Sequence, residues 1–142
     1  MAGEPIDLIR LEGGRNSVVL RIDGKQRHER TDVLVGEFEV RTPFVRGSLQ
    51  TWVFPDDLRQ WQQALDLLDA GRDAAWREGG RAPWLFIERD EDDDRCRVTL
   101  QDHSMSLTAV TVTVPLTDAW FDDAYDRLDR IWETWPPSGD QA

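Results

Sequence analysis

The stretch FVRGSLQTWVFPDDLRQWQQALDLLDAG, residues 44–71, decides the fold, because its hydrophobic period changes partway along. Residues 44–54 alternate in the manner of a β-strand. One face of that strand carries Val45, Leu49 and Val53, and the other carries Phe44, Trp52 and Phe54. Because both faces are partly apolar, we expect the strand to lie at the centre of a sheet, with something packed on each side.

From Pro55 onward the apolar spacing becomes helical. Leu58, Trp61, Leu65 and Leu68 form a single stripe. Proline is tolerated in a first helical turn, and the carboxylates of Asp56 and Asp57 favour the positive end of a helix dipole. Gly71 is a natural stop after the stripe. The sequence therefore predicts an amphipathic helix that follows the strand directly.

Shorter strands are predicted before this unit. Residues 6–11 and 17–23 are aliphatic runs separated by a Gly-rich turn, as in a hairpin. Residues 24–30 are polar and are predicted as a loop. Residues 32–41 alternate again, but the apolar parity changes across Gly36, so we expect a β-bulge at this glycine.

The C-terminal half predicts more strands and a second helix. Residues 73–78 form a weak strand, and residues 84–89, 95–102 and 106–114 form better ones. Thr117-Asp118 begins a helix whose apolar residues continue to Trp135, before two prolines. The expected fold is α+β, with a single antiparallel sheet of about seven to eight strands packed with two amphipathic helices. We expect one domain over residues 1–137 and a disordered tail over 138–142.

Composition restricts the partners. The 142 residues carry a formal charge of −11 and have a pI near 4.5. Nucleic acid is a poor direct partner, because phosphate binding requires a basic surface. A basic protein fits better, although the same charge would also serve solubility alone. The sequence shows no apolar leader and no membrane-length apolar run, and it has one cysteine, so we expect a cytoplasmic protein.

The acidic run at residues 90–94 is the most conspicuous local feature. It resembles the start of a calcium loop, but Arg95 replaces the required glycine and Gln101 replaces the required glutamate. The run is interpreted as a solvated hairpin tip, or alternatively as a docking tip for a cationic partner. The partner-binding residues predicted on it are Asp90, Asp92, Asp93 and Asp94.

No catalytic, cofactor-binding or metal-binding residue is predicted. His28 and His103 lack a second ligand at metal spacing, and the glycine pairs lack a phosphate-loop lysine. Cys96 alternates with Val98 and Leu100, which predicts a packed core residue and not a reactive thiolate. The sequence therefore favours a non-enzymatic protein over an enzyme and leaves the second open.

The seven tryptophans allow two interpretations. Trp61, Trp120 and Trp132 lie on helical stripes and are assigned to the core. Four others are less constrained: Trp52, Trp76, Trp84 and Trp135. An exposed tryptophan beside carboxylates would make an interface anchor. Trp76 and Trp84 are predicted, with the acidic run, to contact a partner.

Three segments carry a resemblance to a known family. They are residues 7–11 (DLIRL), the stretch from residue 44 (FVRGSL) into PDDL and Trp61, and the closing aromatic helix with Trp132 and Trp135-Pro136. Together they resemble an actinobacterial family of unknown function that is distantly similar to the WapI-type immunity proteins of polymorphic toxin systems. The resemblance implies a protein that binds and blocks a cognate toxin, and it transfers no active-site residue.

Two functional hypotheses follow. The first is an acidic, immunity-like protein that neutralises or docks a basic protein such as a cognate toxin. The second is a small enzyme or a small-molecule binder, with a pocket between sheet and helix lined by tryptophans and carboxylates. Homodimerisation through a strand edge such as residues 106–114 is compatible with either.

Overall fold

The computed structural model describes residues 4–90 and 94–136. The tail predicted for residues 138–142 lies outside them. Within the described residues the chain forms eight strands and two helices. In chain order these are β1 (Ile6–Gly13), β2 (Asn16–His28), β3 (Thr31–Arg41), β4 (Arg46–Val53), α1 (Pro55–Asp69), β5 (Ala74–Trp76), β6 (Trp84–Asp90), β7 (Arg95–Asp102), β8 (Thr108–Pro115) and α2 (Asp118–Thr134).

The strands form two antiparallel sheets of four, and not the single sheet expected from the sequence. The first sheet has the order β1-β2-β3-β4, and the second has the order β5-β6-β7-β8. Each sheet is a meander of sequential neighbours, and α1 separates them along the chain. The α+β class is confirmed. The division has a physical reason, because two sheets that share one core bury apolar faces that a single flat sheet would leave uncovered.

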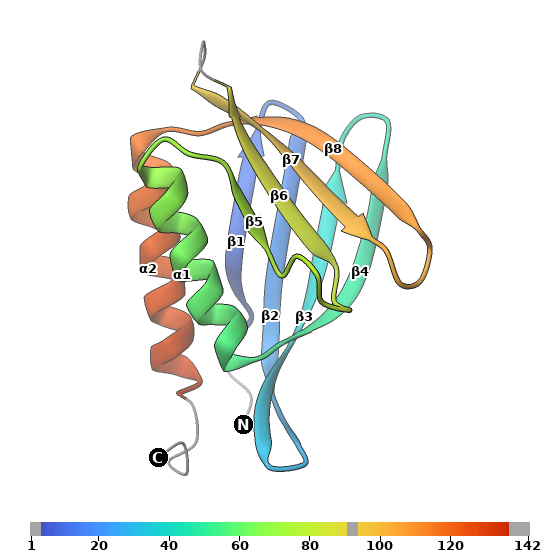
Figure 1. The fold of residues 1–142 in the computed structure, drawn as a ribbon, viewed down its shortest axis with the longest axis vertical. Helices are drawn as coiled ribbons and strands as arrows, with labels where there is room; N and C mark the ends of the chain where they lie inside the picture. Colours follow the sequence, from blue (N-terminus) through green and yellow to red (C-terminus); the bar gives the residue numbers. More distant parts are fainter. Residues whose placement is uncertain (1–3, 91–93, 137–142) are drawn as a thin grey trace.

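One continuous core joins all the layers. It contains Leu20 and Phe38 from the first sheet and Leu85 and Val98 from the second, together with residues of both helices. Figure 1 shows the two sheets crossing obliquely, with α1 and α2 side by side along one flank. α1 packs against β5 and α2 against β1, so the helices cover one flank of the molecule.

The helix predictions are confirmed. α1 begins at Pro55, where the Asp57 carboxylate accepts a hydrogen bond from the Phe54 amide at 2.9 Å, and Gly71 lies beyond its end with φ +84. The buried stripe of α1 is the predicted one, with Trp61 fully buried. α2 follows Thr117 and ends before Pro136. Trp120 and Trp132 pack against the core but stay partly exposed.

The bulge lies on the strand opposite to the predicted one. β3 is regular at Gly36, whereas β2 shifts register between Ile22 and Gly24, beside it. A Cβ on Gly36 would lie 2.9 Å from Ile22 Cδ1 and 3.0 Å from the Arg21 carbonyl oxygen, so the glycine provides room for the opposite strand. The loop predicted at 24–30 was also wrong, because β2 continues to His28.

β4 lies at an edge, and the central position predicted for it was wrong. Its inner face packs into the core through Val53, as expected. Its outer face carries Trp52, 48% exposed, and is followed by Phe54, 40% exposed. An apolar second face is therefore left open to solvent, which alternation alone cannot distinguish from a face covered by another layer.

Candidate functional site

The two described ends of the acidic run, Asp90 and Asp94, flank the connection between the antiparallel strands β6 and β7. Asp90 ends β6 and pairs with Arg95 at the start of β7, and Asp94 precedes that strand. Asp90 and Asp94 are exposed. Asp92 and Asp93 lie outside the described residues, so their part in the predicted docking tip remains a prediction.

The two predicted aromatic anchors have different surroundings. Trp76 is 1% exposed and packs 5.5 Å from the Trp61 ring, so its assignment to a partner surface was wrong. Burial of the large indole in the shared core is the physical reason. Trp84 is half-buried. Its ring centroid lies 4.1 Å from that of His103, and its indole N–H donates to the Gly80 carbonyl at 2.8 Å.

The single cysteine lies in the core, as predicted. Cys96 is fully buried, and burial raises the pKa of its thiol to about 11. His103 lies on a different loop, where its Nε2 is 3.0 Å from the Ala82 carbonyl oxygen. Residues 4–90 and 94–136 contain no group of three or more His, Cys, Asp or Glu placed to hold a metal ion.

We expect Cys96 to resist thiol-modifying reagents in the folded protein. Raising the pKa from 9.0 to about 11 lowers the thiolate fraction at pH 8 roughly a hundredfold, and the buried sulfur is also shielded. Between pH 9 and pH 11 the folded state keeps this proton while the unfolded state loses it, so the thiol's contribution to stability falls as the pH rises. A colorimetric thiol reagent, added with and without urea, measures the protection. Equal rates in both conditions would contradict it.

Most of the negative charge is concentrated on the two helices. α1 and α2 carry ten carboxylates and three arginines, a net charge of −7 out of the chain's −11. We call their exposed carboxylates the acidic helical face. They are Asp56, Asp66, Asp69, Asp118, Asp122, Asp126, Asp129 and Glu133.

The arginines of these helices are already paired with helix carboxylates. Arg127 lies 2.6 Å from Asp123, and Arg130 lies 2.9 Å from Asp126. Arg59 lies 3.6 Å from Asp56. In the part of the chain that the structure describes, the other carboxylates of the face form no ion pair with an arginine or lysine. Sequence reasoning missed this surface because the contiguous run at 90–94 is more visible. The signal was present, since Asp122, Asp126, Asp129 and Glu133 recur at helical spacing.

A hydrogen bond between the helices orients part of this face. The Tyr125 hydroxyl donates to Asp66 Oδ1 at 2.7 Å, linking α2 to α1. Burial and the neighbouring carboxylate both raise the pKa of Tyr125, so the phenol stays protonated and keeps donating at neutral pH. Two elements far apart in sequence thus present their carboxylates as one surface.

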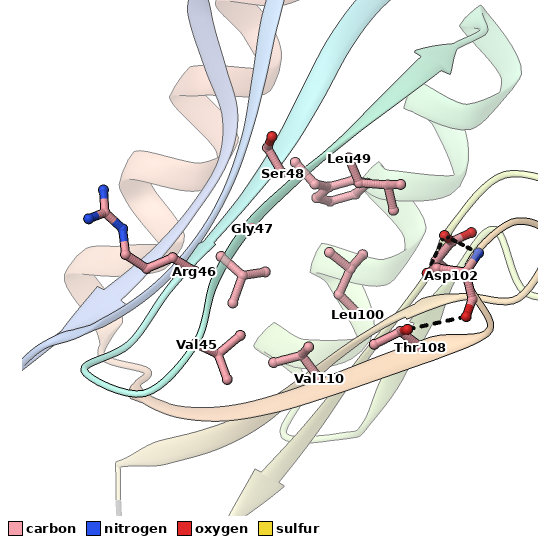
Figure 2. A pocket seen from close by; sticks show the side chains of 12 residues that line it. Val45, Arg46, Gly47, Ser48, Leu49, Leu100, Asp102, Thr108 and Val110 are labelled. Carbon is pink, nitrogen blue, oxygen red and sulfur yellow. Dashed lines mark hydrogen bonds between the residues drawn. The ribbon is translucent and has the colours of Figure 1, made fainter.

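A second surface lies beside the exposed edge of β4. A hollow of about 250 Å³ opens between β4 and the β7–β8 hairpin, and a neighbouring hollow of about 350 Å³ shares Leu49 and Asp102 with it. Figure 2 shows Val45, Leu49, Leu100 and Val110 around the first hollow. We call the two hollows together the edge groove. Its walls are mainly apolar.

The loop at the rim of the edge groove is held by Asp102. This carboxylate accepts hydrogen bonds from the amides of Ser106 and Met105 and from the Ser106 hydroxyl, which lower the pKa of Asp102. The loop exposes Met105 (82%) and Leu107 (79%), and Leu107 has φ +58. Two large apolar side chains therefore lie exposed on a loop. The strand predicted from residue 106 begins only at Thr108, so Leu107 belongs to the loop and not to β8.

A family comparison places the chain. One family model matches residues 6–136, from the start of β1 to just beyond the end of α2. The chain belongs to the DUF5959 family, a family of unknown function. The DUF5959 match spans both the acidic helical face and the edge groove. Comparisons with curated proteins and with solved structures found no match.

The pocket expected for a small-molecule binder has a counterpart in this DUF5959 protein. A hollow between the helices and the first sheet is lined by Trp132, Trp135 and the buried carboxylate of Asp32. Its volume is about 10 Å³, which is the space of about one water molecule. Lys25 Nζ lies 3.7 Å from Asp32 Oδ2. This hollow cannot enclose a metabolite as it stands.

Proposed function

We propose that this DUF5959 protein is a non-enzymatic binding protein that docks a basic protein on its acidic helical face. The observation that carries the proposal is the charge distribution, with a net charge of −7 on two adjacent helices. A concentrated field of one sign steers an oppositely charged partner and raises its association rate. The same field repels nucleic acid.

Aromatic side chains on the same helices support a protein partner. Tyr125 and Trp132 are partly exposed among the carboxylates, and the Arg59 guanidinium lies 6.0 Å from the Trp132 ring centroid. Aromatic residues at the centre of a charged surface supply the apolar contact that charge alone lacks. We infer that the contact is centred here, with the tip near Asp90 and Asp94 as an additional contact.

The resemblance to WapI-type immunity proteins supplies a biological role for such binding. We propose an immunity-like protein, acting in the cytoplasm of an actinobacterium, that occludes a basic toxin. Stable protein complexes bury roughly 800 Å² on each partner, an area that two helices of 15 and 17 residues can provide. Neither helix is long and apolar enough to cross a membrane.

Charge reversal on α2 tests the proposal. The triple variant Asp122→Lys, Asp129→Lys, Glu133→Lys changes exposed side chains only. Its matched control, Glu29→Lys, Glu37→Lys, Glu78→Lys, makes the same change in net charge at exposed residues outside the two helices. The partner is captured from an extract of the source organism with the wild-type chain, purified, and titrated against all three proteins at 50 and 200 mM salt.

The proposal requires that the captured partner is a protein of basic pI, bound in a stoichiometric amount to the wild-type chain. We expect its affinity to fall at least tenfold in the helix variant, much less in the control, and steeply with salt. Equal losses in both variants would reduce the effect to net charge and contradict a localised site. Capture of a small molecule in place of a protein would contradict the function itself.

A further inference from the structure

Three of the four sheet edges in the described part of the chain are covered or short. The β1 edge faces α2, where the Trp120 indole N–H donates to the Arg10 carbonyl at 2.8 Å and Arg127 donates to the Asp7 carbonyl at 3.2 Å. β5 has three residues. Unpaired edges attract other strands, and natural proteins protect them by these means.

The β8 edge is also protected. The Asn16 side-chain amide donates to the Thr113 carbonyl at 3.0 Å, and β8 lies against the β1–β2 hairpin and ends at Pro115. The strand predicted as a dimerisation edge is thus an edge strand, but one that a neighbouring hairpin partly covers.

The β4 edge differs from the other three. Its eight residues contain no lysine and no proline, and its pairing with β3 shows no register shift from Arg46 to Val53. The Thr42 amide donates to the Val45 carbonyl at 2.8 Å, and antiparallel strands exchange hydrogen bonds at every second pair. The outward backbone groups are therefore those of Arg46, Ser48 and Gln50. The next outward carbonyl, that of Trp52, accepts from Arg77 Nη1 at 3.0 Å.

The inner side of this edge offers an apolar hollow. A strand added beside β4 would place every second side chain between the sheets, over Leu49 and against Leu100 and Val110. About 150 Å³ suffices to hold a benzene-sized group, so the hollow of about 250 Å³ accepts a large aliphatic or aromatic side chain.

The Arg46 end of the β4 edge is basic, whereas Ser48 and Gln50, further along the strand, lie opposite Glu39 and Glu37 of β3. Arg46 is exposed and has no ion-pair partner among the described residues, and Figure 2 shows its guanidinium pointing away from the hollow. Arg41 lies opposite it on β3 but is 3.5 Å from the Glu39 carboxylate, so Arg46 carries the free charge at this end. The charged residues that line the edge groove are Arg46, Arg81 and Asp102. The oxygens of Asp102 already accept hydrogen bonds from its own loop. A segment bearing a carboxylate complements this end of β4.

We propose that the β4 edge accepts an extended segment of a partner protein as an additional strand of the first sheet. The segment alternates large apolar residues, which enter the edge groove, with polar residues, and it carries a glutamate or aspartate beside Arg46. Backbone hydrogen bonds supply the affinity, and the alternate pockets supply the specificity. This site is independent of the acidic helical face.

A second copy of the chain fits the same edge poorly. Paired with itself, β4 would offer Gly47, Leu49 and Thr51 to the hollow, of which only one is a large apolar residue. Each copy also carries a charge of −11, which opposes association. Charge and shape therefore favour a carboxylate-bearing segment from another protein.

An array of labelled octapeptides tests the proposal on the full chain. The inward positions vary among Val, Ile, Leu and Phe, and the outward positions are threonine. Each peptide carries a single glutamate, at its N-terminal end in half of the array and at its C-terminal end in the other half. We expect a subset to bind in fluorescence polarisation and to shift the backbone amide signals of Ser48 and Gln50. Two further peptides carry N-methyl groups on the odd-numbered or on the even-numbered amides. One of the two should not bind, because its methyl groups remove the amides that donate hydrogen bonds to β4.

Protein variants complete the test. Arg46→Glu should weaken binding of the glutamate peptides about twofold to fivefold and strengthen binding of the matching lysine peptides. Arg30→Glu, at an exposed position in the β2–β3 turn at the opposite end of the sheet, should change neither. Ser48→Pro should block binding while circular dichroism shows an intact fold. The proposal would be overturned if no peptide of the array bound, or if both N-methylated peptides bound as well as the unmodified one. It would also be overturned if light scattering showed a dimer of the chain that Ser48→Pro converts to a monomer.

Discussion

Replacement of Trp76 by alanine is expected to lower the free energy of unfolding by about 3–5 kcal/mol, a large part of the stability of a typical domain. Trp76 lies where the layers meet. Its ring contacts that of Trp61 from α1 at 5.5 Å and that of Phe38 from β3 at 6.5 Å, and its indole N–H donates to the Asp57 carbonyl at 2.8 Å. Truncation therefore leaves a cavity between two sheets and a helix.

Urea and thermal unfolding followed by circular dichroism measure this loss. Trp76→Phe should lose less, because it keeps an aromatic ring in the core and gives up the hydrogen bond to Asp57, which is worth about 1 kcal/mol. Trp52→Ala is the matched control, since Trp52 is 48% exposed, and it should cost less than half as much as Trp76→Ala. Similar losses for the two alanine variants would place Trp76 outside the core.

The local elements were predictable because their signals are local. The stripe from Leu58 to Leu68 determines α1, and the alternation of Cys96, Val98 and Leu100 determines the buried face of β7. The division into two sheets was not predictable in this way. The alternation of a strand shows that one face is buried, but it does not show which strand lies beside it. The helix α1 stands between β4 and β5 in the sequence, and nothing in its pattern indicates that the next strand belongs to a second sheet.

The candidate sites were hard to predict for the same reason, because each depends on elements that are distant in the sequence. The exposed apolar face of β4 was visible in Trp52 and Phe54, yet it was interpreted as a second packed face because coverage depends on distant elements. The acidic helical face requires α1 and α2 to be adjacent, which the Tyr125–Asp66 hydrogen bond shows and neither helix pattern states. The isolated Trp76 in a weak strand gave no sign that it was a core residue.

Arg77→Ala is expected to be the second most damaging change, at about 3–5 kcal/mol, which is the typical cost of removing one member of a buried polar network. The residue is buried, with 5% of its surface exposed. Besides binding the Trp52 carbonyl, its guanidinium donates to Thr51 Oγ1 at 3.0 Å and lies 4.4 Å from the Trp76 ring centroid. The Asp57 carboxylate is 3.9 Å away. Alanine would leave these acceptors without their donor.

The charge of Arg77 is not the source of this stability. Burial lowers the pKa of Arg77 to about 10, so the protonated form is disfavoured by the fold, and this penalty is present at neutral pH and relieved only as the pH rises above 10. The expected loss comes from the unsatisfied acceptors and the lost packing. Arg77→Met should therefore recover part of the stability lost in Arg77→Ala, because it restores contact with the Trp76 ring.

The backbone of Arg77 provides a sharper comparison. Its φ of +62 is costly for any residue with a Cβ, so Arg77→Gly should be about 1 kcal/mol more stable than Arg77→Ala although both lose the guanidinium. Arg81→Ala, which changes an exposed arginine four residues later, should stay within about 0.5 kcal/mol of the wild type. A glycine variant less stable than the alanine variant would contradict the backbone argument.

The Arg77 guanidinium also binds the Trp52 carbonyl at one end of the β4 edge, so its loss should increase strand-mediated aggregation, measured by light scattering during refolding.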